Sequence, residues 1–314
     1  MDPARLVVQP VVRLKAESLG APGRAWLKAL PDQVAELERR WSIVAEESLA
    51  GGTAAFVAAG ARTVDGTRVV LKILVPDPDF SHEIATLERA AGHGYVRLLA
   101  HDSGSRAMLL EALGPSMDRV GLTPEEQLAT LCRLLTQAWD VPRPRTGPMA
   151  VAVDKATSLA TLVAGLWERL DQPCSAQARD QALRFAERRA AEFSPGHCVL
   201  VHGDAATSNA LRVLADRQGA ETGFVFVDPD GFVGDPAYDL GVALRDWCAQ
   251  ILSAREPVAL TRNYCRLLAR DGGLDEQAIW EWGYLERVST GLYATAMGAH
   301  ELGRPFLDTA EMLL

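Results

Sequence analysis

The hydrophobic pattern changes its period near Gly114, and this change limits the folds available to the chain more than any other feature. Before Gly114, short apolar runs alternate with turn signals such as Asp65-Gly66, a dipeptide that is typical of β-hairpins. After Gly114, apolar residues recur at helical spacing over long segments. A run of strands followed by a run of helices predicts an α+β fold with two lobes.

The first lobe is expected to hold a small antiparallel sheet with one helix inserted between its strands. Its predicted elements, in order, are a helix over 21–41, strands over 43–46, 54–62 and 67–75, a helix over 80–91, and strands over 95–102 and 106–112. The second lobe is predicted to be mostly helical, with helices over 125–139, 159–170, 176–193, 235–253, 257–271 and 275–303 and short strands over 199–202 and 224–228. We therefore expect two domains, 1–113 and 114–314.

Composition and charge exclude several classes of protein. Hydrophobic residues make up 48% of the 314 residues and charged residues 23%, which predicts a folded globular chain. The 41 Asp and Glu against 32 Lys and Arg give a net charge of -9, which disfavours nucleic-acid binding. No apolar run reaches the roughly 20 residues of a membrane helix, and the first residues predict no signal peptide. The five cysteines lack zinc-ligand spacing, so we expect reduced thiols in a cytoplasmic protein.

Two polar loops follow short apolar strands in the second lobe. In the first, Asp204 and Asn209 stand five residues apart after the strand predicted over 199–202. In the second, Asp228 ends the strand predicted over 224–228. Either loop alone fits a simple polar turn, because Asp and Asn favour turns. Two such loops in succession more often place carboxylate and amide oxygens around one cation, and Mg²⁺ prefers these ligands.

Lys72 lies inside the apolar strand predicted over 67–75. A charged side chain there is costly unless it is paired or lines a cleft. One interpretation is a lysine on an edge strand that points to solvent. The other is a point charge on the phosphates of a nucleotide, held by Glu83 or Glu88 of the helix predicted over 80–91. These two glutamates are five positions apart on a helix, so at most one of them faces Lys72 well.

The segment Gly51-Gly52-Thr53 lies between two predicted strands. Small residues let backbone N–H groups approach phosphates. A plain hairpin turn explains the two glycines equally well.

Taken in order, these features are a glycine-containing turn, a strand lysine with a helical glutamate, an Asp-x4-Asn loop and a strand-end aspartate. This is the order of phosphoryl-transfer residues in the protein-kinase fold. The stretches 199–209 and 228–240 resemble the loops of the aminoglycoside phosphotransferase family, and they look most like the branch that contains streptomycin 6-phosphotransferase and hydroxyurea phosphotransferases. Stretches 23–27, 95–102 and 109–111 also resemble that branch, so the resemblance spans nearly the whole chain.

The chain departs from the family's pattern at two positions. The family usually has His two residues after the catalytic Asp, where this chain has Ala206. It commonly has Gly or another small residue before the Asn, where this chain has Ser208. Both departures leave Asp204 and Asn209 in place.

The resemblance implies a bilobal protein-kinase-like fold that uses ATP or GTP together with Mg²⁺. Asp204 is expected to orient the attacking hydroxyl and to accept its proton. Asn209 and Asp228 are expected to hold Mg²⁺ ions that bridge the phosphates. Asp230 either assists them or is a turn residue.

The resemblance also implies a nucleotide site in the first lobe. Lys72 is expected to contact the α- and β-phosphates, oriented by Glu83, because Glu83-x3-Leu87 matches the family's helix. Gly51, Gly52 and Thr53 are expected to approach the phosphates through their backbone. Backbone groups from Glu111 to Leu113, at the end of the last strand of this lobe, are expected to read the adenine edge.

Five residues are candidate substrate contacts: Asp230 of the second polar loop, and Asp246, Trp247, Trp282 and Glu286 of the late helices. Tryptophan at helical spacing is more often part of a core than of a ligand site. Acidic and aromatic residues are nevertheless what a cationic or sugar-like substrate needs.

The expected function is ATP-dependent phosphorylation of a hydroxyl of a small-molecule antibiotic, above all a streptomycin-like aminoglycoside, which confers resistance. Within this class, a nucleoside antibiotic, a hydroxyurea-like compound or a metabolite is the alternative. From another class, a nucleotide-binding pseudokinase is suggested by Ala206 and opposed by the presence of Lys72, Asp204 and Asp228. The expected partner is a small-molecule hydroxyl substrate, with no nucleic acid and no membrane, for a monomer or homodimer.

Overall fold

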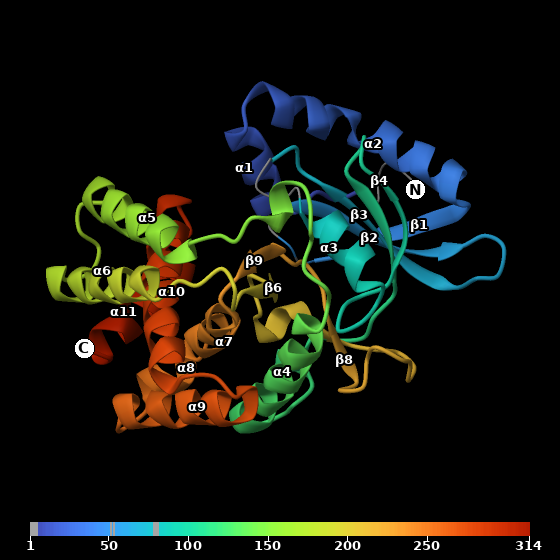
Figure 1. Ribbon diagram of the computed structural model, residues 1–314. Helices are drawn as coiled ribbons and strands as arrows, with labels where there is room; N and C mark the ends of the chain where they lie inside the picture. The colour runs from blue at the N-terminus through green and yellow to red at the C-terminus, as the bar shows by residue number, and fades with distance from the viewer. Residues whose placement is uncertain (1–5, 51, 53, 78–81) are drawn as a thin grey trace. The chain divides into compact units, whose positions relative to one another are not determined.

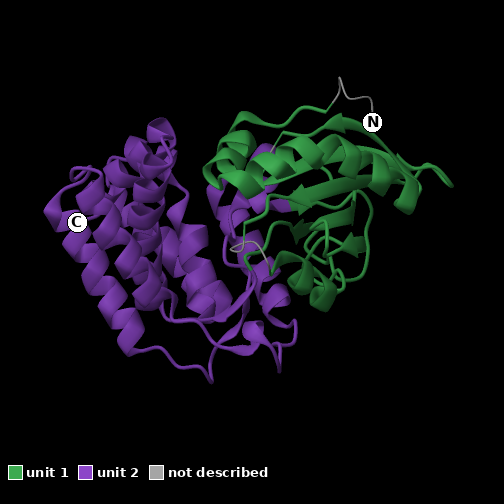
Figure 2. Ribbon diagram, turned by 90° about the horizontal axis from the view of Figure 1, so that it is seen from above, with its two compact units in different colours: residues 1–115, 211–230 green, residues 116–210, 231–314 purple. Residues whose placement is uncertain are grey.

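The computed structural model describes residues 6–50, 52, 54–77 and 82–314 of the chain (Figure 1). The helices are α1 Pro10–Ser18, α2 Ala21–Trp41, α3 Glu83–Ala90, α4 Pro124–Trp139, α5 Lys155–Arg169, α6 Ala176–Ala191, α7 Pro236–Arg245, α8 Cys248–Ser253, α9 Pro257–Gly272, α10 Glu276–Ala296 and α11 His300–Met312. The strands are β1 Ile43–Ser48, β2 Ala55–Arg62, β3 Arg68–Leu74, β4 Leu98–Asp102, β5 Ala107–Glu111, β6 Val199–Val201, β7 Ala210–Arg212, β8 Phe224–Phe226 and β9 Phe232–Gly234. The chain divides into two compact units, a first unit of residues up to 115 with 211–230 and a second unit of residues 116–210 with 231–314 (Figure 2).

The first unit is built on a five-stranded antiparallel sheet with the strand order β1-β2-β3-β5-β4. β3 is the middle strand, and Lys72 lies opposite Val57 of β2 on one side and Met108 of β5 on the other. This central position excludes the edge-strand interpretation of Lys72. A separate two-stranded sheet pairs β7 with β8.

The alternation of side chains along β3 sets the direction of Lys72. Leu71 and Ile73 are buried in one core with Leu30 and Leu37 of α2, which runs with α1 along one face of the sheet (Figure 1). Lys72 therefore points to the opposite face. There it meets α3, whose first residue is its hydrogen-bond partner.

The second unit is a helical body organised around α10, which packs against α5, α6, α7, α9 and α11. Ile279 and Val288 lie on opposite sides of α10 and are both fully buried, so this helix is surrounded by others. The short antiparallel pair of β6 with β9 holds the start of the loop that follows β6. No helix in the described part of the chain is long and apolar enough to cross a membrane.

Two segments predicted as single helices are interrupted in the structure. The segment 235–253 forms α7 and α8, with Asp246 and Trp247 between them. The segment 275–303 ends as α10 before α11 begins. Gly298 lies in this second break with φ of +79°, a left-handed conformation that ends a helix and that glycine adopts without strain.

α7 and α10 cross closely at Gly241. A Cβ atom added to Gly241 would lie 2.3 Å from Cβ of Trp282 and 2.8 Å from the backbone nitrogen of Gly283. We expect Gly241→Ala to lower the free energy of unfolding by about 1–3 kcal/mol, because the two helices must separate. Gly165→Ala is the matched control, since a Cβ at this position of α5 meets no atom within 4 Å.

The control substitution is expected to raise the free energy of unfolding by about 0.5–1 kcal/mol, through the better helix propensity of alanine. Urea unfolding followed by circular dichroism measures both variants. Equal effects of the two substitutions would contradict the close crossing.

Candidate active site

Lys72 is a buried cation in the first unit. It is 5% exposed, and its Nζ donates hydrogen bonds to Oε1 of Glu83 at 2.6 Å and to Oδ1 of Asp228 at 2.7 Å. Burial opposes the charge of this lysine, but the carboxylates of Asp228 and Glu83 outweigh burial and raise the pKa of Lys72 above its usual value. Lys72 is therefore charged at neutral pH and joins α3 to the loop after β8.

The structure distinguishes the two glutamates of α3. Glu83 is itself 5% exposed and is the one that contacts Lys72. Glu88 instead lies 2.8 Å from Nε2 of His101 on β4. The negative charge of Asp230 also acts on Glu83, so the lysine lies among several carboxylates.

Asp228 has an uncommon backbone conformation, with φ of +58°. Aspartate tolerates the left-handed region better than most residues because its short polar side chain makes local hydrogen bonds. The carboxylate reaches Lys72, and 37% of the side chain stays exposed. Backbone strain at the end of a buried strand is frequent at functional sites.

Asp239 of α7 holds the loop that follows β6 in the second unit. Its fully buried carboxylate accepts hydrogen bonds from the backbone N–H of His202 at 2.9 Å, from that of Gly203 at 2.8 Å and from Nε1 of Trp139 at 2.9 Å. Burial raises the pKa of Asp239 even though these donors favour the carboxylate. The sequence pattern does not select Asp239, because the dipole at a helix N-terminus explains an acidic residue there without a loop contact.

Asp204 lies in this loop with both carboxylate oxygens engaged. Nδ2 of Asn209 donates to Oδ2 of Asp204 and to its backbone carbonyl oxygen, both at 2.9 Å. Nη2 of Arg245 donates to Oδ1 at 3.0 Å. Burial opposes ionisation, but the guanidinium outweighs it and lowers the pKa of Asp204. Asp204 is thus a carboxylate of fixed direction at neutral pH, a group that can orient a hydroxyl and accept its proton.

Arg245, the last residue of α7, is not selected by the sequence pattern, although its neighbours Asp246 and Trp247 are. Its Nε donates to Oδ1 of Asp246 at 2.9 Å, and its Nη1 donates to Oε2 of Glu286 at 3.3 Å. Arg245 therefore joins the loop to α10. An arginine at the end of a helix is ordinary in sequence, so only the fold shows these contacts.

The two candidate substrate tryptophans are core residues in the structure. Trp247 is 6% exposed, and its Nε1 donates to the carbonyl oxygen of Ala243 at 2.9 Å. Trp282 is 3% exposed, stacks edge-on against Tyr238 and donates through Nε1 to Asp235 at 2.9 Å. Little of either ring is free for a ligand, so their surroundings favour the core interpretation that the sequence leaves open.

The two candidate substrate carboxylates are engaged as well. Glu286 is 5% exposed and accepts hydrogen bonds from the hydroxyl of Tyr238 at 2.6 Å and from Arg245. Asp246 is bonded to the same arginine, with 26% of its side chain exposed. Of the four candidates on the late helices, Asp246 offers the most surface to a substrate.

The glycine turn is only partly described. Gly51 and Thr53 lie outside the described residues. Gly52 has φ of +74°, and a Cβ added there would meet no atom within 4 Å. A residue with a side chain would be strained at this position by its backbone conformation alone.

The end of β5 is held by a charged side chain. Glu111 accepts hydrogen bonds from Nε of Arg217 at 3.2 Å and from the backbone N–H of Arg97 at 2.9 Å. Its carboxylate is thus committed to the fold of the first unit. The chain continues from there to Leu113, which is partly exposed, and the backbone groups of this segment stay the candidates for contact with a base.

The donor atoms present fit a magnesium ion bound together with phosphates. Within the described residues, no cluster of three or more His, Cys, Asp or Glu side chains is arranged to hold a metal ion. Mg²⁺ bound to a nucleotide needs only one or two protein ligands, because phosphates and water complete its coordination. Asp228 has a partly exposed carboxylate, and Asn209 directs its amide nitrogen at Asp204, which leaves its Oδ1 for another ligand.

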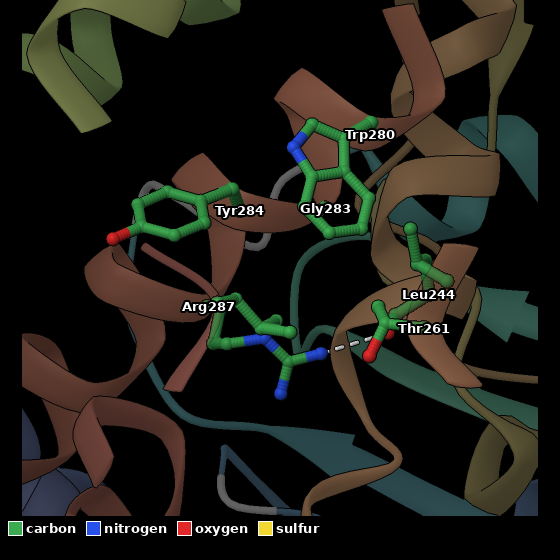
Figure 3. Close-up of a pocket in the computed structure, with 7 residues that line it drawn as sticks. Leu244, Thr261, Trp280, Gly283, Tyr284 and Arg287 are labelled. Atoms are coloured by element: carbon green, nitrogen blue, oxygen red, sulfur yellow. Dashed lines mark hydrogen bonds between the residues drawn. The ribbon is translucent and has the colours of Figure 1, made fainter. Parts of the chain in front are cut away.

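A small pocket lies among α7, α9 and α10 in the second unit (Figure 3). It is lined by Leu244, Thr261, Trp280, Gly283, Tyr284, Arg287 and Leu313. Arg287 donates there to the carbonyl oxygen of Leu244 at 3.0 Å. None of the residues selected from the sequence lines it, so this pocket is separate from the loop that carries Asp204.

Comparison with known proteins shows matches over nearly the whole chain. Residues 40–298 match the family described as aminoglycoside/hydroxyurea antibiotic resistance kinase. The chain is 32% identical to streptomycin 6-kinase of Streptomyces glaucescens over 310 residues, which cover 98% of this chain and 96% of the relative. It is 31% identical to hydroxyurea phosphotransferase of Kitasatospora aureofaciens over 228 residues, which cover 72% and 64% of the two chains.

Solved structures of phosphotransferases share the fold. Aminoglycoside phosphotransferase APH(4)-Ia, in a ternary complex with AMP-PNP and hygromycin B, matches 89% of this chain and 96% of its own with a TM-score of 0.62 at 14% identity. Ethanolamine kinase of Plasmodium vivax matches 87% of this chain and 81% of its own with a TM-score of 0.54 at 15% identity. At such identities the likeness concerns the fold alone, and it confirms the protein-kinase-like α+β fold predicted from the sequence.

Proposed function

The chain belongs to the aminoglycoside/hydroxyurea antibiotic resistance kinase family, and from this premise we propose that it transfers the γ-phosphoryl group of ATP to a hydroxyl of a streptomycin-like aminoglycoside. Family membership confirms the resemblance inferred from the motifs and the expectation of a small-molecule kinase. The single observation that supports streptomycin is the relation to a streptomycin 6-kinase along almost the entire chain. Phosphorylation would add charge and bulk to a hydroxyl that the antibiotic needs for its target.

The first unit is proposed to hold the nucleotide. Lys72 would place its charge on the α- and β-phosphates, and Glu83 would keep it in position through the 2.6 Å hydrogen bond. Asp228 contacts the same lysine in this structure. The carboxylate of Asp228 is partly exposed, and it would bind a metal ion when the nucleotide is present. The backbone amides around Gly52 and the backbone from Glu111 to Leu113 are the remaining proposed contacts with ATP.

The second unit is proposed to carry out the transfer. The substrate hydroxyl donates a hydrogen bond to Asp204, and its oxygen attacks the γ-phosphorus while the bond from phosphorus to the departing ADP oxygen breaks. Asp204 takes the hydroxyl proton. Asn209 and Asp228 would hold Mg²⁺, which supplies charge neutralisation at the phosphate oxygens. In this proposal the nucleotide contacts come from the predicted domain 1–113 and the transfer chemistry from 114–314. Asp228 lies in the second of these ranges but belongs to the first compact unit, through the segment 211–230.

A hydroxyurea-like acceptor is the second candidate, supported by the 31% identity to a hydroxyurea phosphotransferase. A nucleoside antibiotic and a metabolite remain alternatives of the same chemistry. A pseudokinase is less well supported, because the carboxylate and lysine contacts of a transferase are present. We place the protein in the cytoplasm, where ATP is abundant, as a monomer or homodimer.

Growth of a streptomycin-sensitive bacterium that expresses the chain tests the proposed acceptor. We expect the streptomycin concentration that stops growth to rise with the wild-type chain and not with Asp204→Asn. Resistance to hydroxyurea with unchanged sensitivity to streptomycin would favour the second candidate. Sensitivity to both compounds, with the protein folded in the cell, would count against an antibiotic acceptor of either kind.

Metal dependence of nucleotide binding tests the proposed Mg²⁺ ligands. We expect ATP to bind about tenfold more tightly with Mg²⁺ than with EDTA, because the ion joins Asp228 and Asn209 to the phosphates. Isothermal titration calorimetry measures the two affinities. Asp228→Asn should reduce the difference, and Asp271→Asn on α9 serves as the control. Equal affinities in Mg²⁺ and EDTA for the wild type would show that the two loops are misinterpreted.

A further inference from the structure

We propose that Arg245 is a positioning residue for phosphoryl transfer, which holds the carboxylate of Asp204 in the orientation that accepts the substrate proton. This inference rests on the proposed function and deepens it. Arg245 touches Asp204 itself, at 3.0 Å between Nη2 and Oδ1, and only 12% of its side chain is exposed. The guanidinium of Arg245 is engaged by protein carboxylates, so Arg245 acts on the substrate through Asp204.

The two oxygens of Asp204 are held by different partners, Oδ1 by Arg245 and Oδ2 by Asn209. A carboxylate held at one oxygen can still rotate about its last side-chain bond, whereas two partners fix that rotation. Removing Arg245 leaves one partner, and a misplacement of about 1 Å at a reacting group can cost about 100-fold in rate.

Arg245 is itself held by side chains of other segments. Its Nη1 donates to Oε2 of Glu286 on α10, and its Nε donates to Oδ1 of Asp246. Glu286 is fixed in turn, because its Oε1 accepts a 2.6 Å hydrogen bond from the buried hydroxyl of Tyr238. Orientation therefore passes from α7 and α10 to the loop through hydrogen bonds, as positioned active-site groups require.

The guanidinium of Arg245 faces three carboxylates: Asp204, Asp246 and Glu286. Two of these ion pairs do not involve Asp204, so Arg245 is held in place independently of the residue that it orients.

Glu286 and Asp246 then hold Arg245 in place, whereas the sequence suggests that they contact the substrate. Both carboxylates are engaged by Arg245, and they act on the reaction through it. Glu286 is too deeply buried to meet a substrate. We therefore expect losses at these two positions to appear in turnover before they appear in the KM of the acceptor.

Steady-state kinetics of Arg245→Gln and Arg245→Lys with the acceptor that the wild type phosphorylates test the proposal. We expect Arg245→Gln to lower kcat about 100-fold and to leave the KM for ATP within about twofold. Arg245→Lys should recover to within about tenfold of the wild type, because it returns the charge and one donor. Arg304→Gln, at an exposed arginine of α11, is the control and should be unchanged.

A double-substitution cycle separates positioning from a merely structural role. In the Asp204→Asn background, Arg245→Gln should cost less than about twofold, because the group that it positions is already disabled. A kcat for folded Arg245→Gln within about threefold of the wild type would overturn the proposal. So would a full loss in the Asp204→Asn background.

Crystal structures of the wild type, Arg245→Lys and Arg245→Gln test the orientation of Asp204 without an activity measurement. We expect the carboxylate of Asp204 to keep its contact with the cation at position 245 in both, and to leave its wild-type orientation in Arg245→Gln. An unchanged orientation in Arg245→Gln would overturn the proposal. A wild-type enzyme that phosphorylates no acceptor would instead count against the proposed function, and these structures would still decide whether Arg245 orients Asp204.

Discussion

Asp204→Asn is expected to lower kcat for phosphoryl transfer by about 10³-fold and to leave ATP binding almost unchanged. The carboxylate of Asp204 is the proposed proton acceptor. Arg245 keeps the pKa of Asp204 below its usual value, so Asp204 is ionised at neutral pH. Asparagine has nearly the same shape, and its single carbonyl oxygen can still accept a hydrogen bond from one of the two donors, Arg245 or Asn209. It cannot take the proton of the substrate hydroxyl, so the loss should fall on turnover.

Initial rates of ADP formation at saturating ATP measure this loss. Asp308→Asn on α11 is the matched control, because half of its side chain is exposed and its partner is a surface arginine. Thermal melting of both variants shows whether the fold is kept. Turnover of Asp204→Asn within about tenfold of the wild type would mean that another group accepts the proton.

Lys72→Met is expected to have the second-largest effect, because it lowers both kcat/KM for ATP and the free energy of unfolding. The substitution removes the proposed contact with the α- and β-phosphates, and we expect kcat/KM for ATP to fall by about 10²-fold or more. It also leaves the carboxylates of Glu83 and Asp228 without their cation. Loss of one partner from a buried ion pair costs about 3–5 kcal/mol of unfolding free energy.

Two further variants separate these effects. Lys72→Met with Glu83→Gln removes the charge left on α3 and should regain part of the lost stability without regaining the affinity for ATP. Lys28→Met, at an exposed lysine of α2, is the control for loss of a positive charge. Denaturant unfolding and calorimetry with ATP measure the two quantities. An unchanged affinity for ATP in Lys72→Met would remove the lysine from the nucleotide site.

Local pattern predicts those parts of the fold and the site whose signals lie close together in sequence. The strands around Lys72, the helix Ala21–Trp41 and the helix after residue 80 follow from hydrophobic period and turn residues. Lys72 stands out because a lone charge in an apolar strand needs a partner, and Glu83 is only 11 residues away. The Asp-x4-Asn spacing likewise brings Asp204 and Asn209 together within one loop.

Contacts between distant segments cannot be predicted from spacing. Lys72 meets Asp228 across 156 residues, and Arg245 meets Asp204 and Glu286 across 41 residues each. Asp239 holds the loop from a helix that begins only after the second polar loop. In each case the side chain is an ordinary one for its position, and only the packing of strands and helices gives it a partner.

Short elements and helix interruptions are also beyond the pattern. β7 and β9 have three residues each, too few to show an alternation, and α1 shows too few turns of apolar period to stand out. The break between α7 and α8 accompanies the inward turn of Trp247, whose Nε1 bonds to the carbonyl oxygen of Ala243. Continuous helical periodicity over 235–253 contains no sign of that contact.

The central claim is that the protein transfers the γ-phosphoryl group of ATP to a streptomycin-like aminoglycoside. Incubation of the purified protein with ATP, Mg²⁺ and streptomycin, with mass spectrometry of the acceptor and measurement of ADP, tests it most directly. We expect ADP to form in proportion to singly phosphorylated streptomycin, and neither product to form with Asp204→Asn. Tight ATP binding without ADP or phosphorylated product from streptomycin would contradict the claim.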